Sequence, residues 1–420
     1  MPAASSSTSP LAVENSRSVL RHPSFVLFWF SRVLSTLAFQ IQAVAVGWQM
    51  YALTGSTFKL GMVGLTAFLP MVSFSLIAGH VADRYDRRRI ASTCQISEGL
   101  AVATLAASSL GGWVTPGIIF ACVAVIGGAR AFDSPAMQAL VPGLIPESLL
   151  PRAFAWAASA SQTASIAGPA LGGLLYAAGA VAPYSVAAAC FILAGVLAGL
   201  VQMERTAPAR EPVSLRSVFS GVAFIRSRPP IFGSISLDLF AVLLGGATAL
   251  LPVYARDILH IGPWGLGLLR SAPAAGALST SVFLAHHPPR HRVGRVMFGA
   301  VVVFGVATIV FGVSRSVPLS LTALFALGAA DVVSVVIRLS LVQIDTPDAM
   351  RGRVSAVNSL FIGTSNQLGE FESGVTAALF GTVPAVIVGG IGTIVVALLW
   401  MRLFPDLREL DTLGDSSRVR

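Results

Sequence analysis

Acidic side chains stand within long apolar stretches of this sequence, where they are the groups most able to do chemistry. Glu370 and Glu372 lie in the middle of one such stretch, and Asp238 lies in another. A charged group in a lipid-like environment costs about 3 kcal/mol or more unless it is paired or hydrated, so each is a functional candidate. Because burial favours the neutral form of a carboxylic acid, one of the three could load and release a proton near neutral pH.

Partners for these acids lie in the same kind of surroundings. Arg32 and Asp238 occupy matching depths in two apolar stretches, which predicts an ion pair between the two halves of the chain. Asp331 and Arg338 share a third stretch and are further candidates as ion-pair partners. Glu98 is a weaker candidate for proton binding, because a structural bond to a neighbouring helix explains it equally well. Polar and aromatic side chains that could line a substrate cavity are Phe39, Gln42, Gln162, Asn358, Asn366 and Gln367.

Residue patterns typical of an enzyme are absent from the sequence. The one lysine, Lys59, lies outside any GxxxxGK[ST] phosphate-binding loop, so ATP hydrolysis by this chain is excluded. There is no HExxH or GxSxG motif, and the six histidines and three cysteines lack the spacing of metal ligands. We therefore expect no catalytic residues, no metal and no cofactor.

The elements that hold the embedded charges are predicted to be membrane-spanning helices. Hydrophobic residues make up 55% of the 420 residues and charged residues only 11%, too few to cover a soluble domain. The apolar runs do not alternate as barrel strands do, and each approaches the roughly 20 residues that cross a bilayer. The predicted fold class is all-α integral membrane, with twelve spans in two six-helix bundles. We place the spans at 25–52, 58–82, 90–110, 115–138, 153–177, 183–203, 231–254, 264–286, 294–313, 317–340, 354–380 and 383–402.

Basic residues indicate which side of the membrane each loop faces. With both termini in the cytoplasm, 21 of the 28 lysines and arginines fall in inner segments, and only Lys59, Arg256 and Arg315 fall in outer loops. Inner loops carry such an excess, so we expect a multi-pass protein of the bacterial inner membrane with both termini inside. The arginines form short clusters between apolar runs, so the net charge of +9 does not indicate nucleic acid binding.

A proline-rich connection divides the chain near its midpoint. Within it, Leu215, Val218, Phe219 and Val222 recur at helical spacing and predict an amphipathic helix on the inner membrane surface. The expected organisation is a cytoplasmic tail at 1–22, bundles at 23–203 and 231–403, a cytoplasmic linker at 204–230 and a cytoplasmic tail at 404–420.

The two halves of the sequence repeat one another. Glycine, proline and arginine stay in register at an offset of 201 residues, which chance apolar similarity would not readily produce. Two parallel six-helix halves with a site between them are what a transporter needs in order to open alternately to each side. The matched pairs are Gly127 with Gly328, Pro146 with Pro347, Arg152 with Arg353, Gly168 with Gly369, and Gly173 with Gly374.

A local motif follows the second expected span. Residues 79–89 read Gly-His-Val-Ala-Asp-Arg-Tyr-Asp-Arg-Arg-Arg. This resembles the signature loop of the major facilitator superfamily, Gly-x-x-x-Asp-Arg-x-Gly-Arg-Arg, with Asp86 in place of the second glycine. In such a loop Asp83 can cap a helix or pair with an arginine. Arg130 and Asp133 are three residues apart and can pair locally; we assign them to the same inner gate, although a purely structural pair explains them equally well. The expected gate residues are Gly79, Asp83, Arg84, Arg87, Arg88, Arg130 and Asp133.

A second motif lies in the fifth expected span. Ala164-x-x-x-Gly168-Pro169-x-x-Gly172-Gly173 is similar to the antiporter motif of that superfamily, with Ala164 in place of the first glycine. Such glycines allow close helix packing, and the proline bends the helix. The resemblance implies export rather than uptake. Ordinary helix packing in a transporter of either direction is the alternative.

Further stretches narrow the resemblance to one branch. Residues 28–32, 48–56 and 351–356 are similar to the enterobactin-exporter and macrolide-efflux branch. This implies an exporter of a drug-like compound or siderophore that works by alternating access and proton antiport, with the proton gradient as its energy source. We expect it to act as a monomer. The alternatives are a metabolite importer of the same fold and a non-transporting membrane sensor or scaffold.

Overall fold

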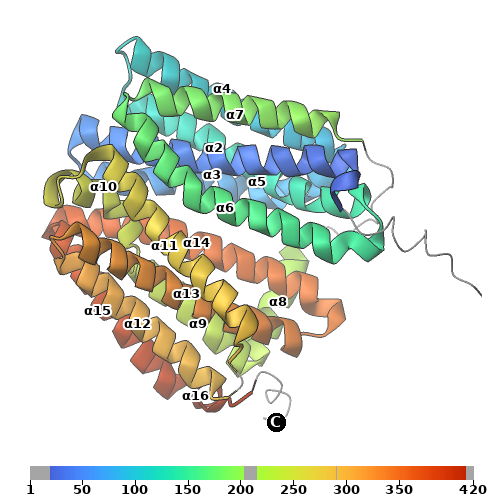
Figure 1. Ribbon diagram of the computed structural model, residues 1–420. Helices are drawn as coiled ribbons and strands as arrows, with labels where there is room; N and C mark the ends of the chain where they lie inside the picture. The colour runs from blue at the N-terminus through green and yellow to red at the C-terminus, as the bar shows by residue number, and fades with distance from the viewer. Residues whose placement is uncertain (1–18, 203–214, 290, 413–420) are drawn as a thin grey trace, which may run out of the picture.

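A computed structural model describes residues 19–202, 215–289 and 291–412, and these residues form a helical protein (Figure 1). The twelve long elements predicted from the sequence are present, and the two halves form two bundles. The first half consists of α2 (Pro23–Thr54), α3 (Thr57–Arg84), α4 (Arg87–Leu110), α5 (Pro116–Leu144), α6 (Leu150–Ala177) and α7 (Val181–Leu200). The second half consists of α9 (Pro229–Leu244) and its continuation, α11 (Gly262–His286), α12 (Val293–Val313), α13 (Val317–Asp345), α14 (Asp348–Phe380) and α15 (Thr382–Leu403). The short elements are η1 (Val19–Arg21), η2 (Glu147–Leu149), α8 (Leu215–Ser227), η3 (Ala247–Leu250), α10 (Leu251–Val253), η4 (Tyr254–Ile258) and α16 (Pro405–Glu409).

Hydropathy separates two of these helices from the rest. Within the described residues, ten helical segments are long and apolar enough to cross a membrane. The helices α6 and α14 are not among them, because serine, threonine and glutamine interrupt the apolar run of α6, and α14 carries asparagine, arginine and glutamate in addition. Both helices pack against helices of the opposite half, α6 against α11 and α14 against α3. Some of their polar residues, among them Gln162 and Gln367, therefore lie at the interface between the halves.

Local sequence fixes the ends of the helices. The Ser56 hydroxyl accepts a hydrogen bond from the Lys59 amide at 3.3 Å and caps α3, and Thr115 caps α5 through the Ile118 amide at the same distance. The turn expected between the fifth and sixth spans is centred on Gly179, whose φ of 113° suits a residue without a β-carbon.

The internal repeat is visible in how the fourth helix of each half packs. A β-carbon on Gly127 in α5 would collide with the backbone of Ala67 in α3. Its repeat partner Gly328, in α13, meets the backbone of Pro273 in α11 in the same way. Both positions need glycine because two helix backbones touch there. The register found in the sequence thus reflects equivalent contacts in the two halves.

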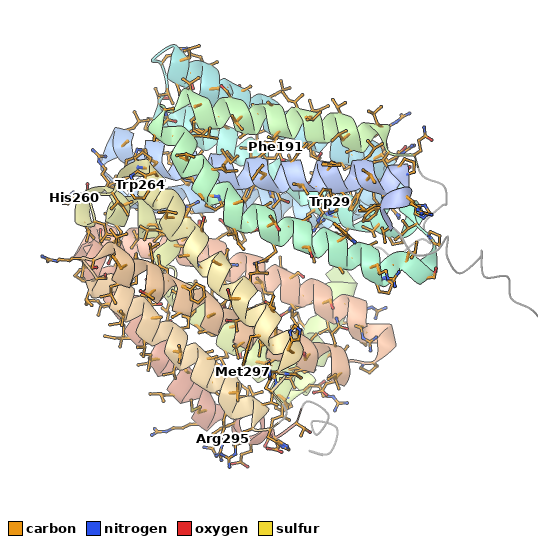
Figure 2. All side chains as sticks on the ribbon, viewed as in Figure 1. Trp29, Phe191, His260, Trp264, Arg295 and Met297 are labelled. Atoms are coloured by element: carbon orange, nitrogen blue, oxygen red, sulfur yellow. The ribbon has the colours of Figure 1, made fainter. Side chains whose placement is uncertain are left out.

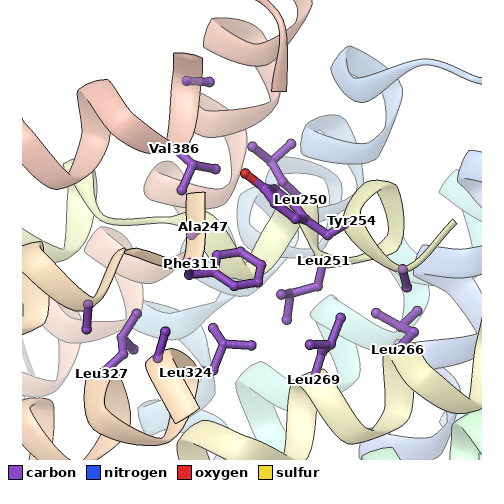
Figure 3. Packing of buried hydrophobic residues seen from close by; sticks show 14 of the residues in the cluster. Ala247, Leu250, Leu251, Tyr254, Leu266, Leu269, Phe311, Leu324, Leu327 and Val386 are labelled. Carbon is purple, nitrogen blue, oxygen red and sulfur yellow. The ribbon is translucent and has the colours of Figure 1, made fainter. Parts of the chain in front are cut away.

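The seventh span is broken, whereas the sequence predicted one continuous helix over 231–254. The helix α9 ends at Leu244, and Gly245 and Gly246 separate it from η3. A β-carbon on Gly245 would lie 2.5 Å from Phe304 Cε1, so the chain bends where only glycine fits. Beyond the break, the Tyr254 ring packs on Phe311 with 4.4 Å between centroids (Figure 3).

The linker and the C-terminal segment pack more closely than the sequence suggested. Ile225 of α8 is buried against α9 and α14, and a β-carbon on Gly221 would lie 3.0 Å from the Arg353 carbonyl oxygen. Around Gly221 and Ile225, α8 therefore covers protein rather than only the membrane surface. Leu407 of α16 is fully buried beside α12, so part of the expected tail belongs to the bundle. The expectations for 1–18, 203–214 and 413–420 lie outside the described residues.

The two ends of the bundle can be told apart by the loops that they carry. We call the end that carries η1, α8 and α16 the terminal end, and the end that carries the turns at Gly55, Gly179 and Gly381 the distal end. In Figure 2, Arg295 lies toward the terminal end, and His260 and Trp264 lie at the distal end.

Candidate functional site

The two halves contact each other tightly at the distal end through pairs of glycines. A β-carbon on Gly61 in α3 would lie 2.9 Å from Gly374 Cα in α14. A β-carbon on Gly173 in α6 would lie 2.9 Å from Gly267 Cα in α11. Gly173 is the last residue of the antiporter-like motif. The motif therefore also packs the two halves together.

The remaining motif residues serve both helix contacts. Gly168 and Gly172 face α2, where β-carbons would lie 2.5 Å from Gln40 Cβ and 3.0 Å from Ile41 Cα. On the other face of α6, a β-carbon on Gly267 of α11 would lie 2.5 Å from the Pro169 carbonyl oxygen. One helix thus binds its own half on one face and the opposite half on another.

Polar contacts reinforce the closure at the distal end. The Tyr51 hydroxyl of α2 donates a hydrogen bond to the Asp257 carboxylate of η4. Arg256 Nη1 donates to the Tyr51 carbonyl oxygen at 3.2 Å. Both bonds join the two halves of the chain, so they act as a latch on this end.

The halves diverge toward the terminal end. In α6, Phe154 and Trp156 are 48% and 43% exposed, and in α11, Val282 and Phe283 are 53% and 60% exposed. In Figure 1 these two helices lie together toward the distal end and separate toward the terminal end. The conformation is closed at the distal end and open toward the terminal end.

A cavity of about 300 Å³ lies between the halves. Helices α2, α3 and α5 form one wall, and η3, α11 and α14 form the other. Its polar and aromatic lining consists of Phe39, Gln40, Gln42, Phe68, Arg130, Arg270, Gln367 and Glu370. A concave site with a few polar groups between two helical bundles has the geometry of a ligand site.

Glu370 and Arg270 lie in this cavity and interact electrostatically. Both belong to the second half, yet both reach helices of the first. Glu370 Oε2 lies 2.7 Å from the position that a β-carbon on Gly64 would take, and Arg270 Nη2 lies 3.6 Å from that of Gly47. The charge state of this pair therefore bears directly on the contact between the halves.

The second acid of α14 is placed differently. Glu372 accepts a hydrogen bond from Thr376 Oγ1 at 2.6 Å, within its own helix. It does not line the cavity. The structure thus separates two acids that the sequence left equivalent.

Arg130 presents a guanidinium to the cavity from the first half. Its Cζ lies 3.8 Å from the centroid of the Phe39 ring. Its Nη1 is buried and has no hydrogen-bond partner among the described residues, and the same is true of Gln42 Oε1. Buried polar groups are normally paired, so these two atoms mark places where a ligand or water can bind.

Arg32 does not pair with Asp238, contrary to the prediction from the sequence. Arg32 Nε donates to Ser161 Oγ at 3.1 Å and interacts electrostatically with Asp133. Asp133 in turn accepts a hydrogen bond from Gln95 Nε2 at 3.1 Å. Arg32 is therefore held inside the first half.

Asp238 is paired within the second half. Arg338 of α13 forms a buried salt bridge with it. A small cavity of about 10 Å³ beside the pair is lined by both Asp238 and Asp331, and has room for about one water molecule. The pairing of Asp238 with Arg338 agrees with the sequence. The pairing of Asp238 with Arg32 was wrong, because each residue is satisfied by its own bundle.

The signature-like loop is organised by the residue that departs from the signature. The Asp86 carboxylate accepts from the Arg88 amide at 3.0 Å, caps α4, and forms a salt bridge with the Arg88 side chain at 2.5 Å. The hydrogen bond from Arg88 lowers the pKa of Asp86 below its usual value. Arg88 Nη1 also donates to the Val201 carbonyl oxygen and Arg87 Nη1 to that of Ala139, both of which tie the loop to other helices.

The proposed gate group is not one cluster. Arg130 lies on the central cavity, away from the loop motif, and Asp133 is bonded to Gln95. Arg84 is exposed. The surroundings of Gly79 and of the Asp83 side chain lie outside the part of the chain that the structure describes, so the role assigned to Asp83 stays a prediction.

Three of the six cavity candidates line the cavity, and three do not. Phe39, Gln42 and Gln367 are on its wall. Gln162 Nε2 instead donates to the Ala274 carbonyl oxygen across the two halves at 3.4 Å. Asn358 is buried and Asn366 is exposed, and neither of them lines the cavity.

Arg270 and Gln40 were missed as site residues. The signal for Arg270 was present in the sequence, since it is a lone charge within the eighth span.

Two six-helix halves around a central cavity are the architecture of secondary membrane transporters. Residues 15–419 match the family described as transmembrane secretion effector. The chain belongs to this family of the major facilitator superfamily. It is a multi-pass membrane transporter that exports a small molecule, and it is not an enzyme.

Curated relatives and solved structures agree with this assignment. The chain is 29% identical to the enterobactin exporter EntS of Citrobacter koseri over 400 residues, covering 92% of this chain and 93% of that protein. It is 26% identical to the enterobactin exporter EntS of Escherichia coli O1:K1 / APEC over the same lengths. The nucleoside transporter NupG has the same fold, with a TM-score of 0.70 and 14% identity over 91% of this chain and 99% of that one. A bacterial homologue of the iron transporter ferroportin, in an inward-facing state, also has this fold. Its TM-score is 0.70 and its sequence identity is 17%, over 94% of this chain and 100% of that one.

Proposed function

We propose that this protein exports a siderophore or a drug-like organic molecule in exchange for protons. The observation that carries the proposal is the cavity between the halves, where Glu370 and Arg270 of the second half reach the helices of the first. The enterobactin exporters to which the chain is similar over most of its length support a siderophore as the substrate.

The proposed orientation places both termini in the cytoplasm. The excess of arginine at the terminal end supports this, because inner loops of membrane proteins are enriched in basic residues. The conformation closed at the distal end is then inward-facing and able to load substrate from the cytoplasm. We expect a cysteine in place of the exposed Tyr85 to react with an impermeant maleimide only after the cells are opened. Labelling in intact cells would contradict the orientation.

Glu370 is the proposed proton carrier of the cycle. When it is ionised it attracts Arg270, and both side chains lie against α2 and α3. Protonation removes the attraction and lets both side chains change their contacts with α2 and α3, which belong to the other half. A proton taken up on the outside and released on the inside would therefore drive the halves between their two arrangements.

The charges of the cavity favour a substrate that carries carboxylate or phenolate groups. Arg130 and Arg270 are the two cations among the lining residues and Glu370 is the single acid, and the Phe39 ring offers an aromatic surface. Guanidinium groups bind carboxylate and phenolate oxygens through charge-assisted hydrogen bonds. We expect competition by enterobactin to exceed that by the cationic dye ethidium.

The test is secretion of enterobactin by bacteria that lack their own exporter and carry this gene. Glu370→Gln should abolish secretion, whereas Glu372→Gln and Asp238→Asn should retain more of it. In liposomes containing purified protein, an imposed pH gradient should drive enterobactin movement by the wild type. Full gradient-driven activity of Glu370→Gln would remove Glu370 from the mechanism, and no secretion by the wild type would reject the substrate.

The proposed working unit is a monomer, because the helices of a single chain enclose the cavity. Light scattering of the purified protein in detergent should give the mass of one chain.

A further inference from the structure

Glu98 is a carboxylate that the proposed cycle does not use. It lies in α4 of the first half and its side chain is fully buried. Neither of its carboxylate oxygens has a hydrogen-bond partner among the described residues. The sequence suggested a structural bond to a neighbouring helix, and the structure does not contain that bond. A buried carboxylate without partners is stable only when it is protonated or when a cation can approach it.

The groups that face Glu98 come mainly from α5. Arg130 and Asp133 interact with it electrostatically, Arg130 favourably and Asp133 unfavourably. Its own helix contributes Cys94, which lies one turn away. The packing of α7 onto this part of α4 is apolar, with Ile192 and Ala188 against Gly99. Among the described groups around Glu98, Arg130 is therefore the one cation that can compensate a negative charge on its carboxylate.

Arg130 connects Glu98 with the central cavity. It lines that cavity and rests on the Phe39 ring, while its Nη1 has no partner. A free donor on a flexible side chain between an unpaired acid and a cavity can move toward either one. An ionised Glu98 would attract the Arg130 guanidinium. With a neutral Glu98, the guanidinium would stay directed into the cavity.

We propose that Glu98 is a proton-binding residue of the first half, and that its protonation controls whether Arg130 faces the cavity. The proton comes from water on one side of the membrane and returns to water, and no other bond is made or broken. Each half then carries an acid beside a cavity arginine, Glu98 with Arg130 and Glu370 with Arg270, and Asp133 lies beside Arg130 as well. The effect on export rests on the proposed function, whereas proton binding by Glu98 does not.

Infrared difference spectra of the purified protein test proton binding without any substrate. The wild type should show the carbonyl band of a buried protonated acid at neutral pH, and the band should disappear as the pH is raised. Glu98→Gln should lose the part of this change that Glu98 contributes, because glutamine has nearly the same shape and cannot titrate, while the other buried acids keep theirs. Glu409→Gln is the matched control, since Glu409 is exposed and paired with Arg408 outside the bundle. Identical spectra for the wild type and Glu98→Gln would overturn the proposal.

The second measurement addresses the link to Arg130. A cysteine replaces Phe39 in a protein whose native cysteines are serine, and its reaction with a maleimide is followed against pH. In the protein with Glu98 the rate should change several-fold as Glu98 titrates, because Arg130 leaves or covers this position. With Glu98→Gln the rate should not change with pH in that range. A pH-dependent rate that survives Glu98→Gln would separate Arg130 from Glu98, while failure of enterobactin secretion by the wild type would reject the proposed function and leave both of these measurements standing.

Discussion

Gly374 and Gly61 bring the two halves of the protein into backbone contact at the distal end. A β-carbon on Gly374 would lie 2.6 Å from Gly61 Cα. Its repeat partner Gly173 makes the same kind of contact with Gly267. The fifth helix of one half and the fifth helix of the other thus each contact the second helix of the opposite half, α6 on α11 and α14 on α3. The closed end is built twice, by the same repeat.

Gly374→Val should therefore open the distal end. Overpacking of a close contact costs about 1–3 kcal/mol, and roughly 1.4 kcal/mol would shift the closed-to-open ratio tenfold. We would measure the labelling rate of a cysteine at Gln367, in the cavity, with an impermeant maleimide added outside the cells. Gly299→Val is the control, because nothing lies within 4 Å of a β-carbon there. An unchanged rate for Gly374→Val would show that this contact does not limit opening.

Tyr51→Phe should weaken the same closure without altering packing. The substitution removes only the hydroxyl that donates to Asp257 across the halves. A net loss of about 1 kcal/mol corresponds to a roughly fivefold shift toward the open state. The labelling assay above would detect it, and Tyr85→Phe, at an exposed position in the terminal-end loop, should leave the rate unchanged. Equal labelling rates for Tyr51→Phe and the wild type would show that the hydrogen bond from Tyr51 to Asp257 does not hold the distal end closed.

Arg338→Met should destabilise the second half by about 3–5 kcal/mol, because it leaves Asp238 as an unpaired buried charge. Combining it with Asp238→Leu should recover much of the loss, since an apolar pair has no charge to compensate. The free energy of unfolding would be measured with denaturant in detergent micelles. Arg408→Met removes an exposed ion pair instead and should cost about 0–1 kcal/mol. Similar losses for the two single substitutions would argue against a buried pair.

The start of α4 should weaken in acid. Arg88 holds the pKa of Asp86 below its usual value, so the carboxylate is favoured in the folded state. The stabilisation is complete above the ordinary pKa of aspartate, about 3.9, and is lost as the pH falls through the lowered folded value. Hydrogen exchange of the Arg88 amide, which donates to Asp86, should accelerate over that interval relative to an amide of α7. In Asp86→Asn this extra acceleration should be absent, and its persistence would mean that another group titrates.

The fold could be predicted from the sequence to a large extent. A bilayer requires about 20 apolar residues for each span and basic residues in the inner loops, and both rules act on local composition. The repeat was readable for a related reason. Backbone contacts such as that of Gly127 with Ala67 admit no side chain, so glycine recurs at the equivalent position 328.

The break at Gly245 and Gly246 was less accessible, although both glycines are visible in the sequence. Glycines are common in membrane helices and do not by themselves end them. The bend depends on Phe304 and Gly369, which pack against this point from distant parts of the chain.

The sequence by itself determined which charges lie within the membrane, and the tertiary structure decided what each of them meets. Glu370 and Glu372 are two residues apart in equivalent surroundings, yet one faces the cavity and the other bonds to its own helix. Asp238 pairs with Arg338 rather than Arg32 because the rotation of each helix within its bundle sets the direction of its side chains. Composition is a property of single segments, whereas a partner is a property of two segments packed together, and only the folded chain brings those segments into contact.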